Sequence, residues 1–169
     1  MFNDDFAGGY QAGQYLLRQG CRNLVFLSIT TGDQVYNERW NGFSAAAVEG
    51  GGNARRLMMP WPLPVASHQQ LQERYTRLFR SARVKFADAD GFGCCNDTCA
   101  EIVFKIMRKN ASTLPLIGYD GWTDAGLPAQ WSTITIDYVA IGRYGVRKLN
   151  NSLLPRFLRI LPECKIQTV

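Results

Sequence analysis

The stretch from Asp90 to Asp120 constrains the fold more than any other part of this chain. It opens with a short apolar run at 91–95 that ends in a polar pair, which is typical of a buried strand followed by a turn. Apolar residues then recur at helical spacing through 98–109, and a second buried run follows at 115–119. A strand, a helix and a strand joined by short links predict a βαβ unit with two parallel strands.

Polar side chains follow both of these strands. Asn96 comes directly after the first strand and Asp120 after the second. The carboxyl ends of parallel strands form the edge at which open α/β sheets bind small ligands, so both residues are candidates for a ligand site. Asn96 also suits a turn before a helix, and the two roles are compatible. Asp97 is expected to cap that helix, in which Thr98 and Glu101 have capping-box spacing.

The same alternation of apolar runs and helical patterns continues along the chain. Strands are expected near 24–29, 55–59, 91–95, 115–119, 132–136 and 163–168, and helices near 5–19, 34–49, 67–81, 98–109 and 138–151. This alternation predicts an α/β fold with a doubly wound parallel sheet. The run at 60–64 holds too many prolines for a central strand, so we expect an irregular crossing near the strand ends.

Composition excludes several classes of protein. With 46% hydrophobic and 20% charged residues among 169, the chain is an ordinary globular protein. The net charge of +5 comes without a dense basic run, which favours a solvated surface over a nucleic-acid interface. No apolar stretch is long enough to span a membrane and no signal peptide is visible, so we expect a cytoplasmic protein with no membrane partner.

Metal and enzyme chemistry have little support. The five cysteines lack zinc-ligand spacing and are expected to be buried, reduced thiols: Cys21, Cys94, Cys95, Cys99 and Cys164. The glycines at 50–52 do not make a phosphate loop, and no serine nucleophile motif occurs. His68, the one histidine, suits a surface position. We therefore expect no enzyme, no metal and no cofactor.

Five segments, taken in order, resemble the lac/galactose-repressor (LacI/GalR) family of bacterial transcriptional regulators. They are D-D-F-A-G-G-Y with the following Y-L-L-R-Q-G-C-R-N-L-V-F-L-S, then N-E-R-W-N-G-F, G-F-G-C-C-N-D, L-P-L-I-G-Y-D and W-S-T-I-T-I-D-Y-V-A-I-G. The resemblance covers essentially the whole chain, and its strength lies in the order of the segments. It implies a periplasmic-binding-protein-like fold, in which two α/β subdomains hold a ligand in the cleft between them.

The resemblance also implies that part of the family's architecture is missing. The headpiece and the first half of the N-terminal subdomain would be absent. Residues 1–20 and 132–153 would then be a remnant of the N-terminal subdomain, and residues 21–131 and 154–169 the C-terminal ligand-binding subdomain. The helices at 5–19 and 138–151 would lack their own sheet. Each large apolar side chain left in water forgoes roughly 1.5–3 kcal/mol. We therefore expect these helices to pair with each other, drive association or remain poorly ordered.

Four residues match the family's ligand-binding positions. Arg39 matches its arginine, whose planar fork of donors suits a pair of sugar hydroxyls, a carboxylate or a phosphate, although by itself it would be read as a helix-surface residue. Asn96 and Asp120 match an asparagine and an aspartate that bind ligand hydroxyls. From the sequence alone, Asp120 suits a loop carboxylate equally well. Trp61 lies near the family's ring-stacking aromatic, or is a core or loop residue.

Three departures from the family pattern leave the identity of the ligand open. Ala7, Gly121 and Ile136 stand where family members carry acidic or polar residues.

Two functions from different classes are therefore weighed. The first is the sensing core of a LacI-type regulator that binds a sugar or related small molecule, forms a homodimer, and reaches DNA only through a headpiece absent from this chain. The alternative is a periplasmic sugar-binding protein that serves a transporter. The order of the segments favours the regulator, and direct operator binding by the isolated chain is expected to be absent.

Overall fold

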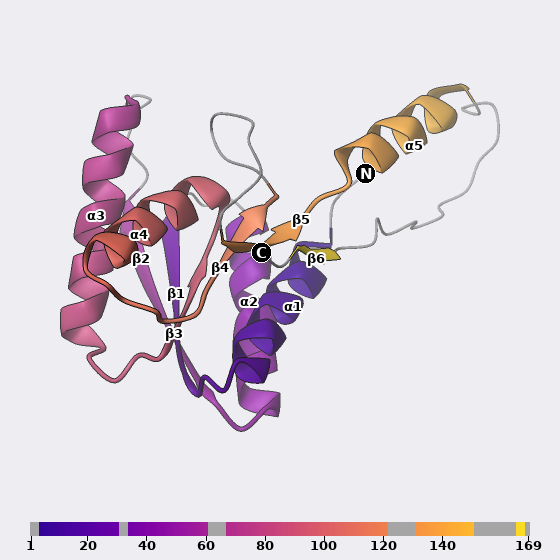
Figure 1. Cartoon of the computed structure of the whole chain (residues 1–169). Coiled ribbons are helices and arrows are strands. Elements are labelled where there is room, and N and C mark those ends of the chain that lie inside the picture. Colours follow the sequence, from indigo (N-terminus) through magenta and orange to yellow (C-terminus); the bar gives the residue numbers. More distant parts are fainter. Residues whose placement is uncertain (1–3, 31–33, 61–66, 122–130, 151–164, 168–169) are drawn as a thin grey trace.

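The computed structural model describes residues 4–30, 34–60, 67–121, 131–150 and 165–167. Helices and strands alternate along the chain, as the sequence predicts (Figure 1). In order they are α1 (Asp5–Arg18), β1 (Asn23–Thr30), α2 (Gln34–Glu49), β2 (Asn53–Pro60), α3 (His68–Lys85), β3 (Gly91–Cys94), α4 (Asp97–Lys109), β4 (Leu116–Asp120), β5 (Ser132–Thr135), α5 (Tyr138–Asn150) and β6 (Lys165–Gln167).

The strands form one sheet with the order β2-β1-β3-β4-β5-β6. Strands β2 to β5 pair in parallel, and β6 pairs antiparallel with β5. The predicted doubly wound parallel sheet is therefore confirmed, with an antiparallel strand added at one edge. The strand order reverses between β1 and β3, and the carboxyl ends of the strands at such a reversal are where open α/β sheets bind ligands.

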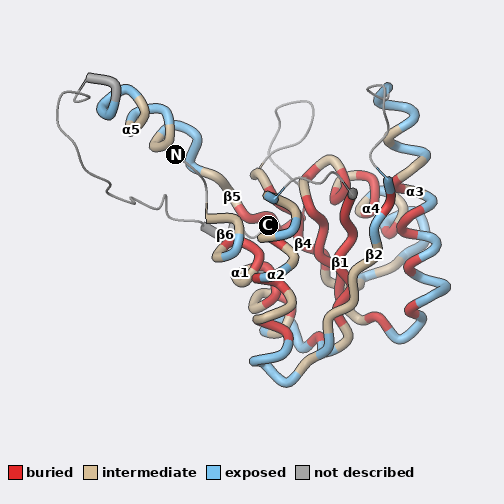
Figure 2. The backbone as a smooth tube through the Cα atoms, turned by 180° about the vertical axis from the view of Figure 1, so that it is seen from behind, coloured by how far each residue is buried: buried red, intermediate tan, exposed pale blue. Residues whose placement is uncertain are grey.

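Helices cover both faces of the sheet. Helices α1 and α2 pack on one face, and α3 and α4 pack on the other (Figure 1). The central strands are buried between these layers (Figure 2), which explains why their sequences are apolar runs and do not alternate. Aromatic rings fill the layer beside α2, where the ring centroids of Phe26 and Phe43 lie 5.1 Å apart.

Helix α1 contacts α2 at backbone distance. A Cβ atom added at Gly9 would lie 1.9 Å from the carbonyl oxygen of Arg39, and one added at Gly42 would lie 1.9 Å from that of Phe6. Ala12 and Leu16 of α1 also belong to the buried core. The expectation that the 5–19 helix has no sheet to pack on in this chain was therefore wrong. Small residues on both helices allow the close approach.

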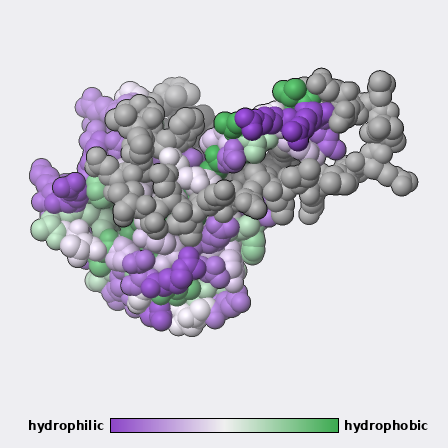
Figure 3. Space-filling model, turned by 45° about the vertical axis from the view of Figure 1, so that its right-hand side comes forward, coloured by the Kyte–Doolittle hydropathy of each residue, from purple (hydrophilic) through white to green (hydrophobic). Residues whose placement is uncertain are grey.

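Helix α5 projects away from the body of the molecule (Figures 1 and 2). Tyr138, Val139 and Val146 are exposed on it. Figure 3 shows hydrophobic residues beside strongly hydrophilic ones along this arm. Among the described residues α5 has no extensive contact with the sheet, and the expectation that this helix belongs to another subdomain stays a prediction. The strand before it, β5, which we had grouped with this helix, pairs with β4. The division of the chain into two subdomains stays a prediction.

Two helix termini differ from the sequence prediction. Helix α3 runs four residues past the expected end. Its N-terminus is stabilised by a capping box. In this box the Ser67 hydroxyl accepts a hydrogen bond from the Gln70 amide, and the Gln70 side chain accepts one from the Ser67 amide. Helix α4 begins at Asp97, and its cap is Asn96, whose side-chain oxygen accepts from the Cys99 amide at 2.9 Å. The expected roles of Asp97 and Thr98 as the cap were therefore wrong.

Candidate ligand-binding site at the carboxyl edge of the sheet

Polar side chains from four elements meet beside the carboxyl ends of β3 and β4. Arg39 comes from the second turn of α2, and Asp5 from the first turn of α1. Asn96 follows β3, and Asp120 is the last residue of β4. The structure thus brings together three of the four residues that the sequence singles out. The fourth, Trp61, lies outside the described residues.

The Arg39 guanidinium is the centre of this cluster. Only 5% of Arg39 is exposed. Its Nε donates to Asp5 Oδ1 at 2.9 Å, and its Nη1 donates to the Cys95 carbonyl oxygen at 2.6 Å. The same Nη1 lies 3.4 Å from Asp120 Oδ1. The planar group also stacks on an aromatic ring, with its central carbon 3.6 Å from the Tyr119 ring centroid.

Two carboxylates compensate the buried charge of Arg39. Burial alone would lower the pKa of the guanidinium, but attraction to Asp120, Tyr119 and Asp5 outweighs burial and raises the pKa. An unpaired buried cation would be strongly unfavourable. The interaction with Asp5 on α1 and Asp120 on β4 therefore ties α2 to both of its neighbours in the fold.

Asp120 has an unusual backbone and an unusual carboxyl group. Its φ is +113°, in a region that non-glycine residues rarely adopt. Burial and the neighbouring charge of Asp97 raise the pKa of its carboxyl to about 6, against the opposing effect of Arg39. Such strain costs on the order of 1–3 kcal/mol and is concentrated at functional sites. Strain, burial and a shifted pKa together favour Asp120 as a functional residue.

Asn96 combines both roles that the sequence allows. Its side-chain oxygen caps α4, as described above. The phenols of Tyr36 and Tyr75 also have the Asn96 side chain as a hydrogen-bond partner. Burial raises the pKa of Tyr36 to about 12, so this phenol stays protonated and can donate a hydrogen bond. The result is a wall of neutral donors and acceptors beside the Arg39 cluster.

Sequence reasoning missed three members of the site. Asp4 and Asp5 stand together at the start of α1, and only one of them can cap the helix. Asp4 is the cap, with its Oδ1 2.8 Å from the Ala7 amide nitrogen, and this leaves Asp5 to pair with Arg39. Two successive acids before a helix were the available signal, because one residue can occupy the cap position. Tyr36 and Tyr119 carried no comparable signal.

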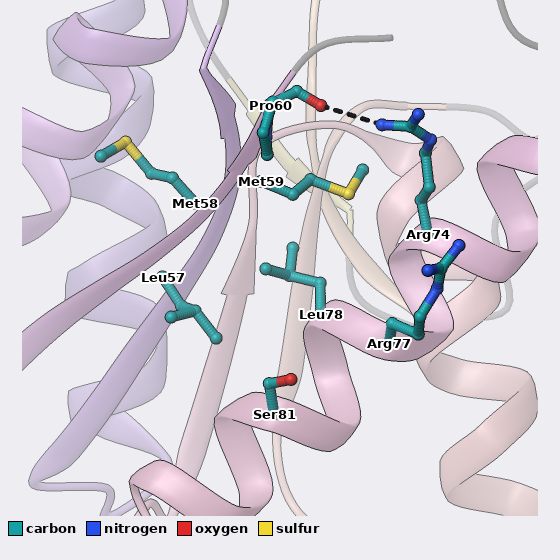
Figure 4. Close-up of a pocket in the computed structure, with 8 residues that line it drawn as sticks. All are labelled: Leu57, Met58, Met59, Pro60, Arg74, Arg77, Leu78 and Ser81. Carbon is teal, nitrogen blue, oxygen red and sulfur yellow. Dashed lines mark hydrogen bonds between the residues drawn. The ribbon is translucent and has the colours of Figure 1, made fainter.

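A hollow lies away from this cluster, between β2 and α3 (Figure 4). Its volume is about 410 Å³. Arg74 and Arg77 line it beside the apolar side chains of Leu57, Met59 and Leu78. None of the residues that line it belongs to the Arg39 cluster. The hollow is therefore a separate surface feature.

Metal chemistry and membrane insertion find no support in the described ranges. Within them, histidine, cysteine and acidic residues form no group of three or more that could hold a metal ion. No helix in this part of the chain is both long and apolar enough to cross a bilayer.

The fold matches that of solved bacterial transcriptional regulators. A PurR family transcriptional regulator from Vibrio parahaemolyticus superposes with a TM-score of 0.79 and 17% identity, over 98% of this chain and 61% of that chain. A LacI family regulator from Silicibacter pomeroyi gives 0.76 and 18%, over 98% and 51%. A periplasmic binding protein/LacI transcriptional regulator from Alkaliphilus metalliredigens, complexed with D-xylulofuranose, gives 0.73 and 19%, over 98% and 62%.

These matches confirm the predicted periplasmic-binding-protein-like fold. At such low identity the likeness establishes the fold alone. The chain spans between 51% and 62% of the length of these three structures. No family model matches the chain, and no curated protein matches it by sequence.

Proposed function

We propose that this chain is the effector-sensing part of a LacI-type transcriptional regulator, and that it binds a sugar or a related polyhydroxylated molecule. The observation that carries the proposal is the buried Arg39 held between Asp5 and Asp120 at the strand ends, with Asn96 alongside. Carboxylate oxygens accept hydrogen bonds from ligand hydroxyls, whereas amides and phenols both donate and accept. This set suits a ligand with several hydroxyl groups.

The charge of the site favours a neutral ligand over a phosphorylated one. Asp5, Asp97 and Asp120 outnumber Arg39, and two of these carboxylates already engage the guanidinium. A phosphate placed here would meet net negative charge in a partly desolvated environment, which is unfavourable. Free sugars are therefore preferred to sugar phosphates as candidate effectors.

The proposal assigns sensing and DNA contact to different parts of a longer protein. Under this proposal, the sheet and helices α1 to α4 form the ligand-binding subdomain, and α5 contacts a second subdomain. Ligand binding favours one relative position of the two subdomains, and the change is read out by a dimer through DNA-binding headpieces. Residues 1–169 themselves act through the small molecule and not by catalysis.

A panel of free sugars tests the site directly. Solved proteins of this fold bind D-xylulofuranose, ribose and cellobiose, so D-xylulose, D-ribose and cellobiose are added to the wild-type protein in a thermal-shift titration. A ligand at about 100 times its Kd stabilises by about 2.7 kcal/mol, which is readily seen as a shift in Tm. Matching sugar phosphates serve to test the preference for neutral ligands.

Two variants make this test specific. Asp120→Asn removes one carboxylate charge from the site, and Asp88→Asn removes an exposed carboxylate in the link before β3, at the opposite edge of the sheet. We expect saturable stabilisation in the wild type and in Asp88→Asn, and its loss in Asp120→Asn. If no sugar in the panel stabilises the protein, or stabilisation survives Asp120→Asn, the proposed site is wrong.

The alternative, a periplasmic sugar-binding protein of a transporter, would use the same cluster of residues. The two functions differ in what the gene encodes upstream of Met1. A helix-turn-helix sequence supports the regulator and a secretory signal peptide supports transport. Sequencing that region distinguishes them.

A further inference from the structure

Asp97 is a buried carboxylate that accepts hydrogen bonds from three directions. Only 1% of the residue is exposed. Its Oδ1 lies 2.8 Å from Trp131 Nε1, and its Oδ2 lies 2.7 Å from the Gly121 amide nitrogen. The Thr133 hydroxyl lies 2.9 Å from both carboxylate oxygens. One side chain at the start of α4 thus holds the end of β4 and the start of β5.

The contact between Asp97 and the strained end of β4 runs in both directions. The Asp97 backbone amide donates to the Asp120 carboxylate, whereas the amide of the next residue, Gly121, donates to the Asp97 carboxylate. Both Asp120 and Gly121 have positive φ, at +113° and +99°. A strained non-glycine conformation persists only where the surrounding contacts determine it. Here Asp97 holds both the side chain of the strained residue and the peptide amide that follows it.

The chemistry at this position requires a carboxylate. The Trp131, Thr133 and Gly121 groups around Asp97 all donate, so an amide in its place would turn an N–H group towards another donor. The carboxylate also lies directly against β4, because a Cβ atom added at Gly118 would be 2.0 Å from Asp97 Oδ1. Its charge disfavours ionisation of Asp120 nearby.

We propose that Asp97 is a positioning residue, which holds the Asp120–Gly121 peptide in its positive-φ conformation and so directs the Asp120 carboxylate towards Arg39 and the ligand. The part of this inference that concerns the ligand rests on the proposed function. The part that concerns the backbone of Asp120 does not, and it can be tested without any ligand.

Two substitutions separate positioning from general stability. Asp97→Asn keeps the size of the side chain but replaces one of its two acceptor oxygens with an NH2 donor. Trp131→Phe removes a donor to Oδ1 of the same carboxylate and leaves the oxygen that binds the Gly121 amide, so it is the matched control. The three-bond HN–Hα coupling of Asp120 reports its φ by NMR: it is small at positive φ of this size and large in an extended strand. The affinity for D-ribose is measured by calorimetry as the second readout.

In Asp97→Asn we expect the coupling to rise towards the extended value and the D-ribose affinity to fall at least ten-fold. Trp131→Phe is expected to lower Tm but to leave both readouts as in the wild type. Wild-type values of both in Asp97→Asn, or equal changes in Trp131→Phe, would overturn the proposal. If Asp97→Asn does not fold, the wild type alone still tests the proposal. A large HN–Hα coupling of Asp120, or a Gly121 amide that is not protected from hydrogen exchange, would overturn it. If wild type binds no sugar, the proposed function fails, but the coupling still decides the role of Asp97.

Discussion

Gly9→Ala is the substitution whose effect follows most directly from the contact between α1 and α2. The new methyl group would lie 1.9 Å from the carbonyl oxygen of Arg39. Ordinary C···O contacts begin at about 3.3 Å, so the helices would have to separate by roughly 1.4 Å. Replacing glycine inside a helix gains about 1 kcal/mol of helix propensity. Overpacking against an oxygen of the main chain, which cannot rotate away, costs about 3 kcal/mol.

We therefore expect a net destabilisation of about 2 kcal/mol, or a fall in Tm of about 4–8 °C for a chain of this size. Urea unfolding followed by circular dichroism measures the free energy. Gly142→Ala in α5 is the matched control, because a Cβ atom there would have no neighbour within 4 Å. It should leave stability unchanged or raise it slightly. If Gly9→Ala is as stable as Gly142→Ala, the two helices are not in backbone contact and the reasoning fails.

Three further outcomes are expected. The folded-state pKa of Asp120, about 6, lies above its unfolded value, so the stability that this carboxyl contributes is fully present below about pH 4 and is lost as pH rises through about 6. The stability of the wild type relative to Asp120→Asn, measured by urea unfolding, should therefore fall by about 1 kcal/mol from about pH 5 to about pH 7.5; a rise would contradict the assigned shift. Ser67→Ala removes the acceptor for the Gln70 amide and should cost about 1 kcal/mol in the same assay, whereas no change would show that the cap contributes nothing. Iodoacetamide at about pH 8 should label the described cysteines at least ten-fold faster in urea than in the native protein, by mass spectrometry, because the native thiols are buried: Cys21, Cys94, Cys95 and Cys99.

Local sequence signals predicted the fold because each one has a local physical cause. Buried parallel strands need apolar runs on both faces, and the polar residue that follows such a run falls at the sheet edge. This is why the positions of Asn96 and Asp120 could be predicted before their contacts were known. The pairing of Arg39 with Asp120 follows from the same placement of strand ends.

Long-range packing could not be predicted in the same way. Helical periodicity identifies an apolar face on α1 but not the surface that covers it, and the glycines that allow contact with α2 read equally well as helix breakers. The role of Asp97 depends on Trp131 and Thr133, more than 30 residues away. Such partners meet only after the sheet has formed, so no spacing along the chain reveals them.

The N-terminus of α5 lies close enough to the candidate site to be affected by its charges. Tyr138, the first residue of that helix, has its pKa raised by burial and then by the charge of Asp120. A helix of 13 residues is about 20 Å long, so a tilt of about 10° at its base moves the far end by about 3 Å. A rearrangement at Asp120 that tilted this helix by that angle would therefore displace its far end by about the length of a hydrogen bond.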